Sequence, residues 1–224
     1  EWEEPVRRQS EHFDAYRAAL DRLFAAGLLY PAFLSRGEAR GIIAETEASG
    51  EHWPHDPDGV PLYPDTDRKL SKRTRTRRLK QGGPFAWRLD MEKALATVGE
   101  SLSWEERGMG PQGEKGEVVA RPELWGDVVL ARKDVPTSYQ LSVVVDDALQ
   151  GITEVVRGRD LFHATSVQRL LQALLGLPAP AYFHHELVMG PDGRKLSKSL
   201  RDTGIATLRE AGTTPAEIRK MVGL

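Results

Sequence analysis

The sequence predicts an α/β fold in which helices alternate with the strands of a largely parallel sheet. The chain has 224 residues and 40% hydrophobic content, enough to bury a core as one or two domains. In its second half, apolar runs of strand length alternate with segments of helical period, an order typical of α/β proteins. No apolar run reaches the length of a membrane span, so we expect a cytoplasmic protein.

Composition excludes some classes of protein and singles out one basic segment. The absence of cysteine excludes disulfides and thiolate metal sites, and it is compatible with a reducing cytoplasm. The net charge of −2 points neither to nucleic acid nor to a membrane surface. Basic residues nevertheless crowd between Arg68 and Lys80. This segment is either a solvated helix face or a contact with an RNA backbone, and the sequence leaves both open.

Two helices are predicted near the start of the chain. Apolar residues recur at three- and four-residue spacing over residues 10–26, and Gly27 is a natural C-terminal cap. A second helix is expected over residues 35–48. Ser35 is its N-cap, and Glu38 completes a capping box.

The middle of the chain has less regular structure. Four prolines within residues 52–67 exclude a long helix or strand there. The basic segment is expected to be helical over residues 70–80, and residues 85–90 alternate like a short strand. The glycines between residues 108 and 116 predict a flexible connector.

The second half alternates strands and helices. Residues 138–150 could form a strand by composition, but their apolar residues fit the helical period better. The elements predicted here are a strand at 127–132, a helix at 138–150 capped by Thr137, a buried strand at 152–156, a helix at 165–175, and a final helix to Val222 that begins at a capping box of Thr214 and Glu217.

The strongest signal for chemistry is the loop GPDGRKLSKS at residues 190–199. A Pro-Asp-Gly turn presents Lys195 and Lys198 together with two serines. Mobile ammonium groups suit the charge that develops on the phosphates of a nucleotide during attack at the α-phosphorus. Taken alone, the loop is equally consistent with a solvated basic surface.

Several motifs together resemble one enzyme family. KLSKS at residues 195–199 resembles the second signature of class I aminoacyl-tRNA synthetases, and residues 139–147, 151–161 and 168–178 resemble their glutamate-specific branch. The resemblance runs from Arg8 to the end of the chain, with motif order and spacing in agreement. It is to the class I glutamyl-tRNA synthetase-like family, and within it to the glutamyl-queuosine tRNA(Asp) synthetases.

The resemblance implies a fold and a domain organisation. We expect part of a Rossmann-like class I synthetase core with a small inserted α/β subdomain similar to an acceptor-binding domain. Residues 1–30 would end the first half of the nucleotide-binding fold, 31–125 would form the insert with a degenerate zinc site, and 126–224 would supply the second half, the KLSKS loop and a short C-terminal helix.

An expected signature of the family does not occur in the sequence. Class I enzymes bind ATP with a HIGH-type motif at a helix N-terminus, and the histidines His184 and His185 lie far downstream without that setting. Residue 1 is also Glu rather than Met. We therefore expect an N-terminally incomplete chain that does not catalyse pyrophosphate exchange by itself.

The resemblance also implies roles for individual residues. Tyr139 and Arg157 would contact L-glutamate, because a planar guanidinium can bind a carboxylate through two hydrogen bonds. Lys198 would contact ATP, with Lys195 in support and Mg²⁺ as the expected partner of the triphosphate. Asp146 or Asp147 would face the ribose or the amino group of the substrate.

Ordinary structural roles are the alternative for the same residues. Without the resemblance, Arg157 would be expected to pair with Asp146, Asp147 or Asp160, and Tyr139 to pack against the core.

Zinc is not expected. Related enzymes hold zinc through two cysteines, a tyrosine and a third cysteine. Here Ala32 and Leu34 occupy the first two positions, Tyr63 is kept, and Asp67 replaces the last cysteine. Tetrahedral zinc needs four donors and at most two remain, so packing of Leu34 is predicted to hold the subdomain instead.

The function implied is ATP-dependent activation of L-glutamate and its transfer to queuosine in the anticodon of tRNA(Asp). Only 25 residues follow Ser199, too few for the anticodon-binding region of a glutamyl-tRNA synthetase. The alternatives are a truncated glutamyl-tRNA synthetase and a non-catalytic module that binds glutamate or tRNA. A monomer is expected, although no residue pattern addresses the oligomeric state.

Overall fold

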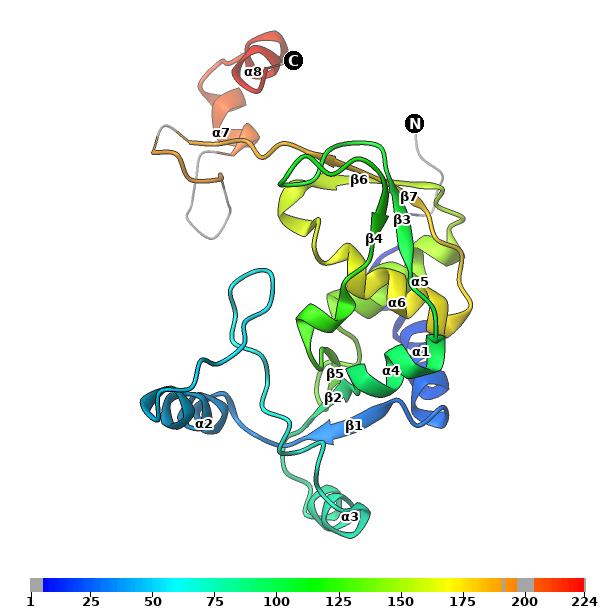
Figure 1. The fold of residues 1–224 in the computed structure, drawn as a ribbon. Coiled ribbons are helices and arrows are strands. Elements are labelled where there is room, and N and C mark those ends of the chain that lie inside the picture. The colour runs from blue at the N-terminus through cyan, green and yellow to red at the C-terminus, as the bar shows by residue number, and fades with distance from the viewer. Residues whose placement is uncertain (1–5, 191, 197–203, 224) are drawn as a thin grey trace.

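The computed structural model describes residues 6–190, 192–196 and 204–223, whose strands form two sheets with helices packed between them (Figure 1). The strands are β1 (Leu29–Ala32), β2 (Ala86–Leu89), β3 (Ser103–Glu106), β4 (Gly116–Val119), β5 (Val129–Arg132), β6 (Glu154–Gly158) and β7 (Ala181–His185). The α-helices are α1 (Phe13–Ala25), α2 (Arg36–Ala48), α3 (Lys72–Lys80), α4 (Met91–Val98), α5 (Tyr139–Leu149), α6 (Thr165–Leu175), α7 (Ile205–Glu210) and α8 (Pro215–Met221). Short 3-10 helices are η1 (Gln9–Glu11), η2 (Pro122–Trp125) and η3 (Arg159–Leu161).

The first sheet is antiparallel and has the order β1-β2-β5. Leu29 pairs with Leu89 at one end of the β1–β2 ladder, and Ala32 pairs with Ala86 at the other. The prediction of a largely parallel sheet is therefore wrong for this part of the chain. The predicted helix-strand alternation does not apply here, because β1 and β2 are joined through the projecting segment that carries α2 and α3.

The second sheet is mixed and has the order β4-β3-β7-β6. Strand β7 pairs in parallel with both β3 and β6, whereas β3 and β4 form an antiparallel hairpin. Strand β6 lies at the edge of this sheet, and Val156 is 63% exposed. The prediction of a buried strand at 152–156 is thus corrected to an edge strand that begins two residues later.

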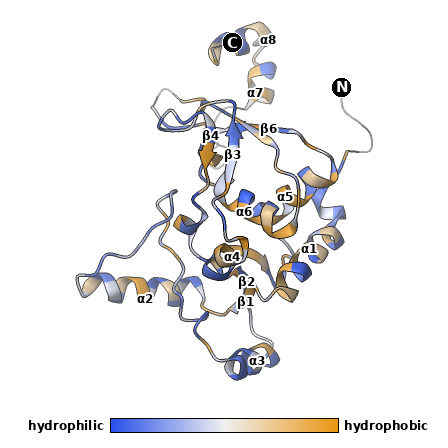
Figure 2. Ribbon diagram, turned by 45° about the vertical axis from the view of Figure 1, so that its right-hand side comes forward, coloured by the Kyte–Doolittle hydropathy of each residue, from blue (hydrophilic) through white to orange (hydrophobic). Residues whose placement is uncertain are grey.

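The core lies where α1, α4, α5 and α6 meet between the sheets. Helix α5 packs on β5 and α6 packs on β3, so the two helices join the sheets. Figure 2 shows apolar residues on these helices, while α2 and α3 project away from the body. The fully buried side chains at the centre include Tyr16, Leu23, Leu89, Leu130, Leu141, Leu170 and Leu171.

Local signals in the sequence fix several helix ends. Ser35 and Glu38 form the predicted capping box of α2, and Thr214 and Glu217 form that of α8. The N-cap of α5 is Ser138, whose hydroxyl accepts from the backbone of Leu141, and the prediction of Thr137 as the cap is wrong.

Residues 108–116 were predicted to be a flexible connector, but two of their glycines, Gly108 and Gly110, lie in close packing contacts. A Cβ on Gly108 would lie 2.5 Å from the carbonyl oxygen of His184, and one on Gly110 would lie 2.6 Å from the Phe162 ring. Both positions therefore need glycine for space: Gly108 lets the chain after β3 pass close to β7, and Gly110 lets it pass close to Phe162. Within the described residues, no helix is long and apolar enough to span a membrane.

The predicted domain boundaries remain a prediction. The β1-β2-β5 sheet takes its strands from residues 29 to 132, so it joins all three of the predicted ranges. Helices α7 and α8 stand apart from the rest of the molecule in Figure 1, and no residue of either helix is buried.

Candidate active site

Arg157 lies near the end of the edge strand β6, where its guanidinium is held by several partners. Nε donates to Nε2 of His184 at 3.0 Å, and Nη1 donates to Oε1 of Gln168 at 2.8 Å. Nη2 donates to Oγ1 of Thr165 at 2.6 Å and to the carbonyl of Leu161 at 3.3 Å. These bonds account for four of its five N–H groups, so one N–H of Nη1 has no partner among the described residues.

A line of amides connects Arg157 to the start of helix α5. Gln168 is buried, and its Nε2 donates to Oε1 of Gln140 at 3.0 Å while its Oε1 accepts from Arg157. Gln140 follows Tyr139, the first residue of α5, whose side chain is 50% exposed. Tyr139 therefore does not pack in the core, and the structure places it beside residues that connect to Arg157.

Two acidic residues on α5 have different environments. Asp146 is 5% exposed and accepts from Nε of Arg7 at 2.7 Å, from Nε2 of Gln9 at 2.9 Å and from the hydroxyl of Tyr16 at 2.8 Å. Its carboxylate is thus a structural anchor for the N-terminal segment, and the expectation that it faces a substrate group is wrong.

Asp147 differs from its neighbour. Burial raises its pKa, while the positive charge of Arg157 acts in the opposite direction. Asp147 therefore lies within the electrostatic reach of Arg157. No ion pair of Arg157 with Asp146, Asp147 or Asp160 occurs among the described residues, so the ordinary pairing considered for Arg157 is also wrong.

The predicted nucleotide loop approaches the same end of β6. Nζ of Lys195 lies 2.8 Å from Oδ2 of Asp160, three residues after Arg157. Both side chains are partly exposed, so the pair contributes little to stability and mainly locates the loop. Lys198 lies outside the described residues, and its predicted role remains a prediction.

Sequence reasoning missed the group that packs behind Arg157. The Arg157 guanidinium lies 5.0 Å from the Tyr182 ring centre, and the rings of Tyr182 and His184 stack at 6.0 Å. His184 in turn bonds to Glu106, and both residues are buried. The alternation of Tyr182 and His184 along β7 was an available signal, since residues two apart lie on one face of a strand.

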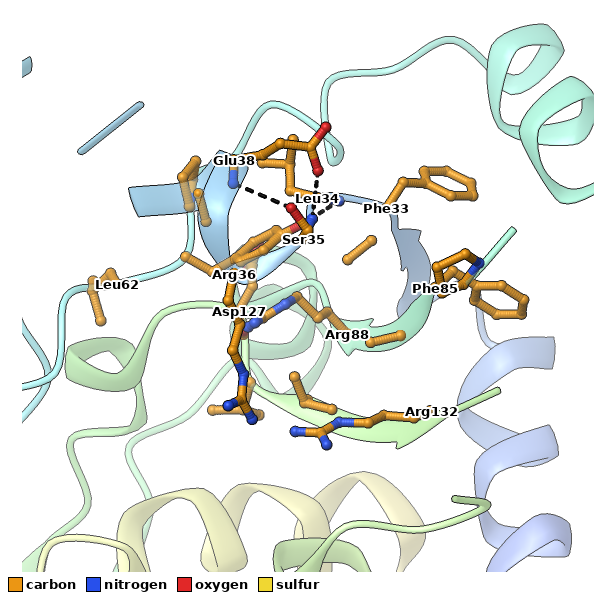
Figure 3. Close-up of a pocket in the computed structure, with 18 of the residues that line it drawn as sticks. Phe33, Leu34, Ser35, Arg36, Glu38, Leu62, Phe85, Arg88, Asp127 and Arg132 are labelled. Atoms are coloured by element: carbon orange, nitrogen blue, oxygen red, sulfur yellow. Dashed lines mark hydrogen bonds between the residues drawn. The ribbon is translucent and has the colours of Figure 1, made fainter. Parts of the chain in front are cut away.

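A cavity of about 1210 Å³ opens beside this region, between the first sheet and the loops that lead to α2 and α3 (Figure 3). Phe33 and Phe85 lie together on its wall, and Arg88 and Arg132 extend from the sheet. Gln140 also lines the cavity, whereas Tyr139, Arg157 and Lys195 do not. Aromatic rings beside guanidinium groups are suited to stacking on nucleic-acid bases and to contact with phosphate.

The degenerate zinc positions form a hydrogen-bonded cluster around one carboxylate. Oδ2 of Asp67 accepts from the hydroxyl of Tyr63 at 2.6 Å and from the backbone N–H groups of Phe33 at 2.6 Å and Leu34 at 3.0 Å. Its Oδ1 lies 3.4 Å from Nη1 of Arg78. Donors therefore surround the carboxylate where a metal would need acceptors, and this set of residues does not fit zinc.

The same cluster corrects the prediction that packing of Leu34 holds the subdomain. The side chain of Leu34 is only half-buried, whereas Asp67 is 2% exposed. Among the described residues, no group of three or more His, Asp or Glu side chains is placed to hold a metal ion.

Half of the basic segment has structural partners. Arg68 lies within ion-pair distance of Asp65, Asp90, Glu92 and Asp127, and Lys69 pairs with Asp65. Arg75 lies over the Tyr30 ring, and Arg78 lies over the Phe33 ring. The remaining cations, Lys72, Arg73, Arg77 and Lys80, are exposed on α3. Arg73, Arg77 and Lys80 share one face of the helix by their spacing.

Comparison with known proteins finds a matching family and relatives that share one name. The model of the family described as "tRNA synthetases class I (E and Q), catalytic domain" matches residues 1–224. A protein of Rhodobacter capsulatus named glutamyl-Q tRNA(Asp) synthetase is 41% identical over 227 residues, covering 100% of this chain and 77% of that protein. One of the same name from Geobacter sulfurreducens is 41% identical, covering 92% of this chain and 57% of that protein.

More distant relatives have a related name. A glutamate–tRNA ligase of Aquifex aeolicus is 33% identical and covers 96% of this chain and 41% of its own length. The crystal structure of a glutamate tRNA ligase from Elizabethkingia meningosepticum, in complex with its amino acid, matches with a TM-score of 0.65 and 23% identity. The match covers 87% of this chain and 37% of the ligase chain, and this likeness concerns the fold alone.

Proposed function

The chain belongs to the family of class I tRNA synthetases (E and Q), catalytic domain, and on that premise we propose that it activates L-glutamate with ATP and passes the glutamyl group to queuosine in tRNA(Asp). ATP is a substrate throughout this family. Mg²⁺ as the partner of the triphosphate and tRNA(Asp) as the acceptor are parts of the proposal. The relatives named glutamyl-Q tRNA(Asp) synthetase support the choice of acceptor.

The observation that carries the proposal is the convergence of Arg157 and the lysine loop at one end of β6. One N–H of Arg157 is available to a ligand. The ion pair between Lys195 and Asp160 ties the loop to a residue that follows Arg157 by three positions in the chain. A substrate carboxylate at Arg157 would then lie beside cationic groups that suit the phosphates of ATP. Contact through two hydrogen bonds would require Nη2 to release its 3.3 Å bond to Leu161.

The chemistry proposed for this site is an attack by the glutamate carboxylate on the α-phosphorus of ATP. A bond forms between carboxylate oxygen and phosphorus, the bond to pyrophosphate breaks, and glutamyl-adenylate results. The glutamyl group then passes from the adenylate to the queuosine base, and AMP is released. The residues of the chain contribute by positioning and by electrostatic stabilisation, with no covalent bond to the protein.

The acceptor tRNA is proposed to approach from the side of α3 and the cavity. The exposed face of Arg73, Arg77 and Lys80 suits contact with the phosphate backbone, which is blind to base sequence. The cavity leads from α2 to Gln140, one residue from Tyr139, and its aromatic wall suits an unstacked nucleoside.

A transfer assay with the full-length protein tests the proposal. Labelled glutamate should be incorporated into tRNA(Asp) that contains queuosine and not into tRNA(Asp) that lacks it. Incorporation into tRNA(Glu) would instead assign the chain to the glutamate–tRNA ligases, the function that the name of the Aquifex aeolicus relative favours. Absence of both transfer and ATP-dependent glutamate activation would support a binding module and refute the enzyme proposal.

A further inference from the structure

A buried carboxylate and a buried imidazole lie in line behind Arg157. Oε2 of Glu106, on β3, is 2.6 Å from Nδ1 of His184, on β7. Each side chain is completely shielded from solvent. On its other side the His184 ring reaches Arg157, since Nε2 lies 3.0 Å from the guanidinium Nε. Residues 157 and 184 are also direct partners in the parallel ladder of β6 and β7.

The donors that surround Glu106 favour an ionised carboxylate. Its Oε1 accepts from the backbone N–H groups of Gly108 and His184, both at 3.0 Å. Its Oε2 accepts from the indole of Trp104 at 3.3 Å in addition to the imidazole. Burial alone would raise the pKa of Glu106, but the hydrogen bonds from His184 outweigh it and lower the pKa. Glu106 is therefore an acceptor in all of these bonds.

Both neighbours of His184 require the same tautomer. A guanidinium has donors and no acceptor, so Nε2 of His184 must carry a lone pair towards Arg157. The carboxylate of Glu106 accepts, so Nδ1 must carry the proton. The imidazole is thus neutral, and its two hydrogen bonds orient the ring so that Nε2 faces the Nε–H of Arg157.

We propose that Glu106 and His184 are positioning residues that fix the direction in which Arg157 presents its guanidinium to a substrate carboxylate. This inference rests on the proposed function, because it assigns Arg157 to the amino-acid site. Gln168 and Thr165 hold the two terminal nitrogens, and His184 holds Nε, so all three nitrogens have a partner on the protein side. The Glu106–His184 pair fixes the position of Nε. It thereby sets the rotation of the guanidinium, which the contacts of Nη1 and Nη2 alone would leave adjustable.

A matched pair of substitutions separates orientation from mere packing. In His184→Asn, the amide nitrogen lies near the place of Nδ1 and can still donate to Glu106, but no atom accepts from Arg157. In His184→Gln, the amide oxygen reaches the place of Nε2 and can still accept from Arg157, while the bond to Glu106 is lost. Glu106→Gln places an amide among four donors and favours the tautomer of His184 that turns an N–H towards Arg157.

The measurement is the KM for glutamate and, separately, for ATP, in ATP–pyrophosphate exchange by the full-length protein. His184→Asn and Glu106→Gln should raise the glutamate KM about tenfold or more, the effect of losing a hydrogen bond to a charged group. The ATP KM should change less than about twofold in these variants. The glutamate KM of His184→Gln should stay close to the wild-type value. Tyr30→Phe is the control for stability, since Tyr30 is equally buried and its hydroxyl bonds to Asp127 rather than to a group that contacts Arg157 or His184.

Each outcome decides between the two hypotheses. If Arg157→Ala raises the glutamate KM but His184→Asn and Glu106→Gln behave like Tyr30→Phe, the positioning role is refuted and the proposed function stands. If Arg157→Ala itself leaves the glutamate KM unchanged, Arg157 does not bind the amino acid and the positioning inference fails, whereas glutamate-dependent exchange would still support the proposed function. Equal losses in His184→Asn and His184→Gln would show a packing role and would also overturn the inference.

Discussion

The hydroxyl of Tyr63 donates a 2.6 Å hydrogen bond to the carboxylate of Asp67, four residues further along the chain. The same carboxylate oxygen accepts from two consecutive backbone N–H groups, those of Phe33 and Leu34. Burial, followed by the bond to Asp67, raises the pKa of Tyr63, so its hydroxyl remains a donor at neutral pH. One buried carboxylate therefore ties the loop after β1 to the proline-rich segment.

Replacement of Asp67 by alanine should loosen this part of the molecule. The substitution leaves the backbone N–H groups of Phe33 and Leu34 without their acceptor, at a cost of about 1–3 kcal/mol. Amide hydrogen exchange of Phe33 and Leu34 should accelerate about tenfold or more, because the local opening free energy falls. Asp14→Ala, at a side chain 97% exposed, is the control and should leave both amides unchanged. Unaltered exchange in Asp67→Ala would show that the carboxylate does not hold these segments.

Removal of metal should have no effect on the same region. The Asp67 cluster is closed by hydrogen bonds from protein donors, so its stability does not depend on a metal. Treatment with EDTA followed by thermal unfolding should give the Tm of the untreated protein. A decrease of several degrees that added Zn²⁺ reverses would contradict this account, since a structural zinc site contributes folding free energy directly.

Arg157→Lys should be nearly as harmful as Arg157→Ala. Lysine keeps the charge but cannot reproduce the fork that reaches His184, Gln168 and Thr165 at once. We expect kcat/KM for glutamate to fall about tenfold or more in both variants, the effect of a lost charge-assisted hydrogen bond. Arg159→Lys, two residues along the chain and directed to Glu186 and the Met109 carbonyl, is the matched control. A fully active Arg157→Lys enzyme would exclude recognition that depends on the guanidinium.

Local signals predicted most of the helices, whereas strands β1, β3, β4 and β7 and the contacts around Arg157 were not predicted. The capping boxes at Ser35 and Thr214 were readable because the interacting residues lie three apart. Strands β3 and β7 were missed because their buried positions hold Glu106 and His184, residues that usually indicate an exposed surface. Their burial depends on a contact between residues 78 apart in sequence, which no local period reveals.

The stability of the protein should decrease in acid through His184. Burial lowers the pKa of His184 below its ordinary value of 6.5; the bond to Glu106 opposes this effect, and the positive charge of Arg157 adds to it. The folded protein thus binds fewer protons than the unfolded chain between the two pKa values. The stabilisation is complete above pH 6.5 and is lost as the pH falls through the folded pKa.

The comparison with a non-titrating variant isolates this contribution. The free energy of unfolding, measured by urea denaturation, should fall from pH 7.5 to pH 5.5, and the fall should be smaller in His184→Gln. The titratable and charged groups that face the imidazole are Glu106 on β3, Arg157 on β6 and the neighbouring His185. Since the pKa of Glu106 is itself lowered, its stabilisation is lost only as the pH falls below its ordinary value of 4.5. An equal slope in both proteins would show that His184 does not titrate on unfolding.

The outward face of α3 should determine how strongly tRNA binding depends on salt. Arg75 and Arg78 lie over aromatic rings, which leaves Lys72, Arg73, Arg77 and Lys80 as the exposed cations of this helix without such a contact among the described residues. Each phosphate contact releases condensed counterions. Each contact therefore adds ~0.7–0.9 to the downward slope of log K, the association constant for tRNA, against the logarithm of the salt concentration. Changing Arg73, Arg77 and Lys80 to serine should therefore weaken tRNA binding and reduce that slope by about 2–3. The same change at Arg8, Arg17 and Lys115 removes equal charge from exposed positions outside α3 and should leave the slope nearly unchanged. A triple α3 variant with the wild-type slope would show that this face is only solvated, because charge that contacts phosphate cannot be removed without changing the number of ions released.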